Sequence, residues 1–176
     1  MPPQAPPPPS PPMPPAPPPA PPGAAGSYHT CVVTKDKDVK CFGSGTYGQL
    51  GQDSTDDLGD ESGEMAALAP VYLGAGMTAI SVSVGFSHSC AVLNDHTLKC
   101  WGMGADGRLG YDSTDNKGDA VGEMGALGTV DLGAGWTVLS VSAGAFHTCA
   151  VLNTHAVKCW GFNAYGQLGQ DSTDSL

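Results

Sequence analysis

The sequence predicts an all-β protein, built from a repeated hairpin unit and preceded by a polyproline segment. Three observations carry this prediction. The cysteines recur every 59 residues, the segments before the hairpins alternate apolar and polar residues, and the prolines gather at one end. Fifteen of the sixteen prolines lie in the first 22 positions, so the foldable part of the chain starts near Gly23.

Two series of cysteines set the period of 59 residues: Cys31, Cys90 and Cys149, then Cys41, Cys100 and Cys159. Around them HTCVVTKDKDVKCFG, HSCAVLNDHTLKCWG and HTCAVLNTHAVKCWG keep one frame. A fixed period of this length indicates an array of similar units. We therefore divide the chain into a proline-rich segment (1–26), repeat 1 (27–70), repeat 2 (71–129) and repeat 3 (130–176).

A strand is expected before the second and third hairpins, in AISVSVG and VLSVSAG. There Ile80, Val82 and Val84 alternate with serines, which is the period of a half-buried strand. Repeat 1 has GAAGS at this place, so we expect it to lack this first strand. Repeat 3 is expected to be truncated, which leaves about two and a half units.

Each pair of cysteines is expected to form a disulfide. Folding each hairpin about its midpoint places the two cysteines on directly opposed strand positions, where a bridge can close. The same register implies three-residue loops whose last residue adopts a left-handed conformation, a place that suits His96 and His155. Three such bridges indicate an oxidising compartment.

Zinc binding and buried free thiols are the alternatives for the cysteines. His147 and Cys149 share one strand face, with Cys159 opposite. This supplies three ligands for each unit, and the sequence has no C-x-x-C motif, so zinc is disfavoured.

Two glycine-rich stretches, GSGTYG and GMGADG, match the dinucleotide-binding pattern G-x-G-x-x-G. The third copy reads GFNAYG, with Asn163 at the middle glycine. We interpret that exchange as a position of positive φ and not as a phosphate site. Every candidate for catalysis also recurs in each repeat, whereas catalysis needs one convergent site; we therefore expect no enzyme.

The acidic segments DSTDDLGDESGE and DSTDNKGDAVGE are weak candidates for calcium binding. They have the length of an EF-hand loop but lack its central glycine and its flanking helices. Solvated loops with local turns are the default interpretation. The candidate ligands are Asp53, Asp57, Glu64, Asp112 and Glu123.

The net charge of −10 repels phosphate backbones and anionic lipid headgroups, so nucleic acids and membrane surfaces are poor partners. No run of eighteen apolar residues predicts a membrane-spanning helix, and the first residues do not resemble a signal peptide.

The repeats resemble those of the regulator-of-chromosome-condensation family. Their shared positions are, in repeat 3, Gly144, His147, Thr148, Ala150, Val151, Trp160, Gly161, Asn163, Gly166, Gln167, Leu168 and Gly169. The resemblance implies a β-propeller, usually of seven blades, with glycines in the turns. The short array departs from a closed ring, so the family's exchange activity is not implied. The paired cysteines and the GDESGEM and GDAVGEM inserts are similar to extracellular variants of bacteria and algae.

The proline-rich segment is expected to form a polyproline II helix, because proline lacks a backbone donor and fixes φ. A plain stiff linker or disordered tail is the alternative. The disulfides indicate an extracellular chain, and on such a chain the short Ala-Pro, Ser-Pro and Pro-Pro blocks resemble those of hydroxyproline-rich glycoproteins. This resemblance implies hydroxylated prolines that carry O-linked glycans. The candidate positions are Pro6, Pro7, Pro8, Pro9, Pro11, Pro12, Pro14, Pro15, Pro17, Pro18 and Pro19.

Two functions are compatible with these features. The first is a non-enzymatic extracellular structural glycoprotein, a subunit of a cell-surface or flagellar fibre. It would form a homopolymer through exposed strand edges and its polyproline rod. The second is a secreted propeller fragment that binds protein or carbohydrate through its loops.

Overall fold

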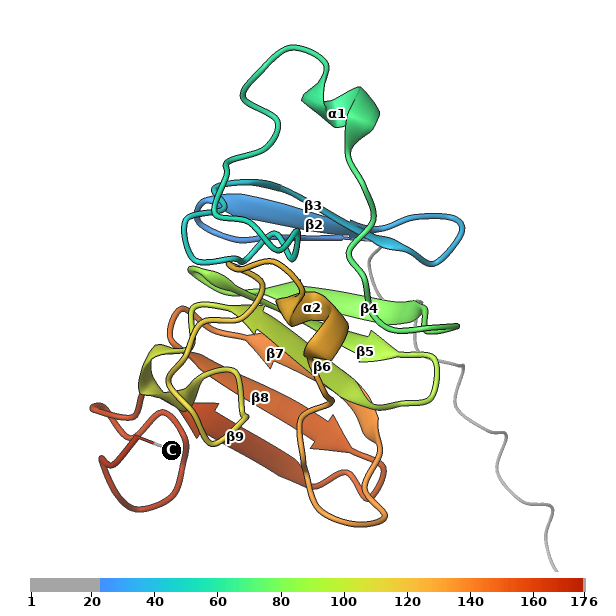
Figure 1. The fold of residues 1–176 in the computed structure, drawn as a ribbon. Helices are drawn as coiled ribbons and strands as arrows, with labels where there is room; N and C mark the ends of the chain where they lie inside the picture. Colours follow the sequence, from blue (N-terminus) through green and yellow to red (C-terminus); the bar gives the residue numbers. More distant parts are fainter. Residues whose placement is uncertain (1–22, 176) are drawn as a thin grey trace, which may run out of the picture.

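The computed structural model describes residues 23–175 and contains three antiparallel sheets of three strands each, stacked face to face (Figure 1). The proline-rich segment and its candidate glycosylation sites lie outside the described residues. In chain order the elements are β1 (Gly23–Ala25), β2 (His29–Val33), β3 (Val39–Gly43), α1 (Glu64–Ala67), β4 (Ala79–Val84), β5 (His88–Leu93), β6 (Leu98–Gly102), η1 (Ala105–Gly107), α2 (Glu123–Ala126), β7 (Val138–Ala143), β8 (His147–Leu152) and β9 (Val157–Gly161).

Each sheet is one blade, formed by three consecutive strands: blade 1 by β1–β3, blade 2 by β4–β6 and blade 3 by β7–β9. The expected cysteine register is confirmed in all three hairpins, where each cysteine faces its partner directly. The turn interpretation is also confirmed, because His96 and His155 have φ values of 63° and 65°. Lys37 takes the same place in blade 1, with a φ of 67°.

The expectation that repeat 1 lacks its first strand is wrong. Gly23–Ala25 forms β1, which pairs with β2 and places Ala24 opposite Cys31. Three small residues carry no alternation of apolar and polar side chains, so the strand had no signal in the sequence. One edge of β2 is consequently covered, and β1 falls inside the segment that was assigned to the proline-rich region.

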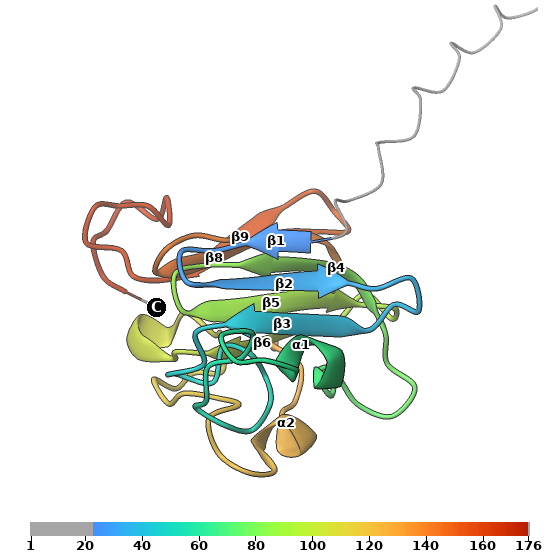
Figure 2. The ribbon, with the colours of Figure 1, turned by 90° about the horizontal axis from the view of Figure 1, so that it is seen from above.

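The core lies between the blades. Figure 2 shows the strands of successive blades lying over one another. Blades 1 and 2 enclose one apolar cluster that contains Leu50, Val71 and Trp101, and blades 2 and 3 enclose a second that contains Leu109, Val130 and Trp160. Each blade therefore buries its apolar face only where another blade covers it.

Two kinds of connection follow the hairpins of blades 1 and 2, and the described residues after blade 3 contain only the first. The first is a glycine-rich loop: loop 1 (48–54), loop 2 (107–113) and loop 3 (166–172) occupy equivalent places in the three repeats. The second is an acidic insert that contains a short helix: insert 1 (58–67) with α1 and insert 2 (117–126) with α2. Among the described residues, neither helix is long and apolar enough to cross a membrane.

Candidate functional site

The three predicted disulfides are present and staple each hairpin. They join Cys31 to Cys41, Cys90 to Cys100, and Cys149 to Cys159. The Cα–Cα distances of 4.0–4.1 Å fit pairs of strand residues that do not exchange backbone hydrogen bonds. The first two bridges are fully buried, whereas the third is half-buried because no described blade covers it. Intramolecular disulfides of this kind are typical of oxidising compartments.

A hydrogen-bonded relay joins blade 1 to blade 2. Nε2 of His29 lies 2.8 Å from the hydroxyl oxygen of Ser89, which is 60 residues further along the chain. This hydroxyl donates to the backbone carbonyl of Gln49 at 2.9 Å. The indole N–H of Trp101 donates to the same carbonyl at 3.0 Å. One carbonyl of loop 1 is thus bound by two groups of blade 2.

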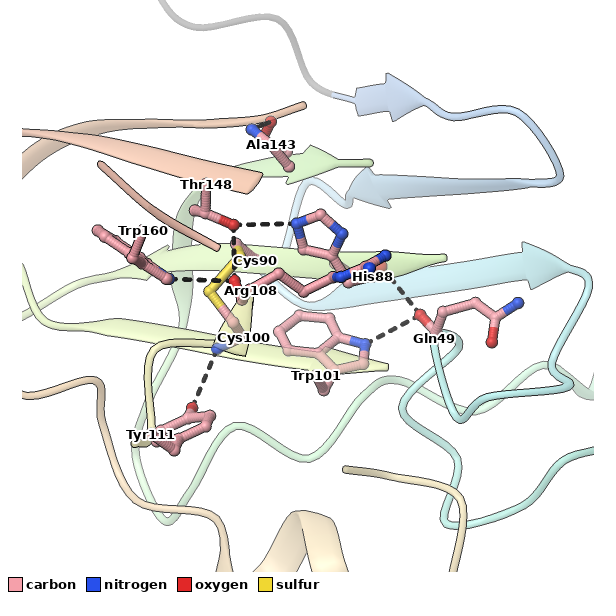
Figure 3. The surroundings of a disulfide bond; sticks show 12 residues. Gln49, His88, Cys90, Cys100, Trp101, Arg108, Tyr111, Ala143, Thr148 and Trp160 are labelled. Carbon is pink, nitrogen blue, oxygen red and sulfur yellow. Dashed lines mark hydrogen bonds between the residues drawn. A yellow bond between two sulfur atoms is a disulfide. The ribbon is translucent and has the colours of Figure 1, made fainter. Parts of the chain in front are cut away.

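The same relay joins blade 2 to blade 3 (Figure 3). Nε2 of His88 lies 3.0 Å from the hydroxyl of Thr148, which donates to the carbonyl of Arg108 at 2.8 Å. The indole of Trp160 donates to that carbonyl at 3.0 Å. The relay therefore repeats with the period of the sequence and always runs from one blade to the next.

The relay fixes the protonation of the buried histidines. A hydroxyl carries one proton, which Ser89 and Thr148 each donate to a carbonyl, so the imidazole must donate through Nε2. The Nδ1 atoms of His29 and His88 are then unprotonated. Neither atom has a hydrogen-bond partner in the described part of the chain. Burial lowers the pKa of His29 to about 4 and that of His88 to about 3.

A second contact latches loop 1 to insert 2. The carboxylate of Asp53 accepts hydrogen bonds from the backbone N–H groups of Gly122, at 3.0 Å, and Met124, at 2.7 Å. Met124 enters the cluster that contains Leu50 and Trp101. The insert backbone lies so close to loop 1 that a Cβ on Gly48 would come within 2.4 Å of the Asp119 nitrogen. The carboxylate and the methionine therefore hold successive repeats together outside the sheets.

The last blade presents the receiving half of both contacts to solvent. We call this surface the tail face and define it by His147, the Gln167 carbonyl, Gly166, Gly169 and Asp171. A Cβ on Gly166 or Gly169 would meet no atom within 4 Å, in contrast to Gly48. A hollow of about 530 Å³ lies here, lined by Gly166, Gly169, Asp171, Ser172 and Thr173.

A larger cavity of about 960 Å³ lies between loop 2 and blade 3. Its lining includes Gly110, Asp112, Val130 and Trp160. The equivalent place between loop 1 and blade 2 is filled by Met124 of insert 2. Among the described residues, no methionine equivalent to Met124 lines the cavity beside loop 2.

The calcium candidates do not converge on one point. Asp53 binds insert 2, Asp57 accepts from the Gly45 N–H at 2.8 Å, and Glu64 and Glu123 accept from backbone N–H groups of their own inserts. Within residues 23–175 no three Asp, Glu, His or Cys side chains gather as metal ligands. Asp112 lies apart, on the wall of the larger cavity. Asp53, Asp57, Glu64 and Glu123 thus act as acceptors for backbone N–H groups.

The positive-φ interpretation of Asn163 is wrong. Gly104 has a φ of −91°, and neither Gly45 nor Asn163 is among the residues of positive φ. The glycines are needed for close approach, because a Cβ on Gly45 or Gly104 would lie 1.9 Å from a carbonyl oxygen of the following loop. In repeat 3 the Asn163 amide instead donates to the carbonyls of Ser172 and Asp174.

A row of aromatic side chains runs across the three blades along one side of the stack. Tyr28 packs on Phe86, Phe86 on Phe146, Phe146 on Phe162 and Phe162 on Tyr165, with ring centroids 5.1–6.2 Å apart. The guanidinium of Arg108 lies 5.1 Å from the Phe146 centroid. Tyr28 is 61% and Tyr165 is 89% exposed. This row was not predicted, because only Tyr28 and Phe146 share a position of the repeat. Phe86, Phe162 and Tyr165 occupy three other positions.

The relay was also missed, although the sequence carries a signal for it. The dipeptides His29-Thr30, His88-Ser89 and His147-Thr148 occupy one position of the repeat. His29 and His88 each bind the hydroxyl of the next dipeptide and not their own neighbour. A conserved spacing of 60 residues between a histidine and a hydroxyl is the pattern that would have predicted it.

Comparison with known proteins identifies the repeat. The model of the "Regulator of chromosome condensation (RCC1) repeat" matches residues 24–49, 79–108 and 138–167. The chain is 31% identical over 155 residues to the regulator of chromosome condensation of Drosophila melanogaster, covering 87% of this chain and 25% of that protein. It is also 31% identical over 156 residues to the ultraviolet-B receptor UVR8 of Arabidopsis thaliana, covering 87% of this chain and 32% of the receptor.

Solved structures share the fold. Human WBSCR16 superposes with a TM-score of 0.65 and 24% identity, over 85% of this chain and 36% of that one. Yeast RCC1 (Prp20), solved bound to Kap60, gives 0.66 and 19%, over 85% and 33%. The chain spans a quarter to about a third of the length of these proteins. It is therefore built of regulator-of-chromosome-condensation repeats, and each of the three supplies one blade of β-propeller architecture.

Proposed function

We propose that this chain is a non-enzymatic extracellular structural glycoprotein, which polymerises with copies of itself into a fibre of a cell surface or flagellum. The observation that carries the proposal is the stapling of every blade by a disulfide next to an uncovered blade surface. Disulfides of this type persist outside the reducing cytosol. An uncovered face that elsewhere in the molecule receives a blade supplies a surface for assembly.

The proline-rich segment is the proposed rod of this fibre. Its composition favours an extended polyproline II helix of about 3.1 Å per residue. Hydroxylation and O-linked glycans at Pro6–Pro9, Pro11, Pro12, Pro14, Pro15 and Pro17–Pro19 would stiffen and solvate it. Because β1 covers one edge of β2, blade faces are better surfaces for polymerisation than the edge of the first hairpin.

Peptide mass spectrometry of native, unreduced material tests the proposal. We expect bridged hairpin peptides, and hydroxyproline carrying sugar within residues 2–22. Unmodified prolines together with free thiols would contradict it.

The aromatic row favours a second candidate, a binding module for protein or carbohydrate. Tyr28 and Tyr165 expose their rings at the two ends of this row, and exposed aromatic side chains are common anchors in recognition surfaces. Titration of Tyr165→Ala and Tyr28→Ala variants against a glycan array tests this candidate. Loss of binding in both variants supports it, and unchanged binding excludes this surface.

A further inference from the structure

We infer that the tail face of blade 3 binds blade 1 of a second copy of this chain, by the same contact that joins successive blades within one copy. The inference rests on the proposed self-association and names its surfaces. The relay part of this contact is made twice inside the molecule, between blades 1 and 2 and between blades 2 and 3. The latch part is made once among the described residues, between loop 1 and insert 2. Each copy leaves one half of it uncovered at each end of the described stack.

The tail face holds the receiving half. His147 is equivalent to His29 and His88, and the Gln167 carbonyl is equivalent to the carbonyls of Gln49 and Arg108. Asp171 is equivalent to the latch residue Asp53, and their φ values are 53° and 54°. Within residues 23–175, the His147 ring, the Gln167 carbonyl and the Asp171 carboxylate have no partner comparable to those of blades 1 and 2.

Blade 1 holds the inserting half, which we call the head face and define by Thr30, Phe42 and Gly63–Met65. Thr30 is equivalent to Ser89 and Thr148, the hydroxyls of the two relays. The backbone N–H groups of Gly63 and Met65 are equivalent to those of Gly122 and Met124, which bind Asp53. Met65 is 48% exposed, whereas Met124 is 1% exposed.

Superposing the repeats predicts the bonds of the contact between copies. The His147 Nε2–H donates to the Thr30 hydroxyl of the second copy, and that hydroxyl donates to the Gln167 carbonyl. The Asp171 carboxylate accepts from the second copy's Gly63 and Met65 N–H groups, while the Met65 side chain enters the hollow beside Gly169. These are the four interactions of the internal contacts, transferred to the ends.

One hydrogen bond of the internal contacts has no counterpart between copies, and its absence weakens the contact. Phe42 stands where blades 2 and 3 have Trp101 and Trp160, so no indole donates to the Gln167 carbonyl. Two chains of net charge −10 also repel each other. We therefore expect a reversible association that strengthens when salt screens this repulsion.

Sedimentation velocity on the intact, oxidised chain tests the inference, over about 1 µM to about 1 mM protein. Met65→Glu blocks the head face by placing a charge in the hollow. Asp171→Lys blocks the tail face by removing the acceptor, and the αL backbone accepts lysine, as at Lys37. Val121→Glu adds the same charge at a side chain that is 95% exposed and outside both faces, and is the matched control.

The expected result is self-association of the wild type and of Val121→Glu, and a dissociation constant at least tenfold higher for each blocked variant alone. An equimolar mixture of the two blocked variants should form a heterodimer that grows no further, because one intact head face meets one intact tail face. A monomeric wild type overturns the inference, as does unimpaired assembly of either blocked variant.

Electron microscopy of the same samples separates this inference from the proposed fibre. Assembly through these faces into a closed oligomer supports the contact and contradicts the fibre. Fibres that form equally well from the blocked variants support the fibre and overturn the contact.

Discussion

The helices α1 and α2 both begin with Glu-Met after a glycine N-cap, yet their methionines differ in environment: Met65 is about half exposed and Met124 is fully buried. The difference lies in what precedes each insert. Insert 2 binds Asp53 in loop 1 of the preceding repeat, whereas the described residues contain no repeat before that of insert 1. Burial in this molecule is thus decided by the neighbouring repeat as much as by the local sequence.

The largest expected effect comes from removing a tryptophan side chain, either Trp101 between blades 1 and 2 or Trp160 beside the larger cavity. Trp101→Ala should lower the free energy of unfolding by about 3–5 kcal/mol, because it leaves a cavity in the cluster between blades 1 and 2 and removes one of the two hydrogen bonds to the Gln49 carbonyl. Trp160→Ala, beside the open cavity, should cost less. Urea unfolding of both variants measures the difference, and equal costs would show that the cavity does not weaken blade 3.

The two methionines give the most direct test. Met124→Ala should cost about 2–3 kcal/mol of unfolding free energy, because the side chain is enclosed by loop 1 and blade 2. Met65→Ala should cost less than about 0.5 kcal/mol, as an exposed substitution does. Both values follow from urea unfolding at low protein concentration. A Met65→Ala cost as large as that of Met124→Ala would contradict the comparison.

Removing a bridge should have a similar but slightly smaller effect. Replacing Cys90 and Cys100 together by alanine should cost about 2–3 kcal/mol, the loop-closure entropy of so short a loop. The half-buried pair of Cys149 and Cys159 should cost the same entropy but leave a smaller cavity. Thermal unfolding of the two double variants compares them; a larger loss for the outer pair would contradict this reasoning.

Acid should destabilise the contacts between blades, because they contain the buried histidines His29 and His88. The folded-state pKa values of His29 and His88, about 4 and about 3, lie below the ordinary value of 6.5, so the unfolded chain binds more protons in this range. Stability is therefore complete above pH 6.5 and falls as pH decreases toward 4. Each of the two histidines contributes up to about 1.4 kcal/mol per pH unit.

Urea unfolding at several pH values measures this slope, and His88→Gln should reduce it. Thr148→Val provides the comparison, since it removes the hydroxyl of the relay but leaves the imidazole buried. It should lower stability at pH 7 and retain most of the slope. A slope that His88→Gln leaves unchanged would assign the acid sensitivity to other groups.

Several features could be predicted from the sequence because they are local. The cysteine register and the left-handed turns at His96 and His155 depend on hairpin geometry within about ten residues. β1 could not be predicted, because Gly23–Ala25 has no alternating pattern and is held by pairing with β2. The role of Gly45 was misjudged since its constraint comes from a carbonyl eleven residues away.

The contacts between blades could not be predicted from local sequence patterns either, because they join residues that are far apart in the chain. The relay joins residues 60 apart, and the latch joins Asp53 to positions about 70 residues away. The periodicity of apolar residues within one short stretch of sequence does not reveal such pairs. Comparing each residue with its equivalent in the next repeat does, and the aligned His-Thr and His-Ser dipeptides are the clearest case.

The placement of the disulfides also governs how the chain responds to tension. Each bridge joins the middles of the two strands of a hairpin, ten positions apart in the sequence. The enclosed segment therefore cannot be pulled out when the chain is stretched. About 30 Å of contour is withheld in every blade, given about 3.4 Å per extended residue. Under tension the molecule would lengthen through its inserts and loops, while the disulfides keep the two strands of each hairpin paired in register. When the tension is released, each hairpin would not need to find its register again.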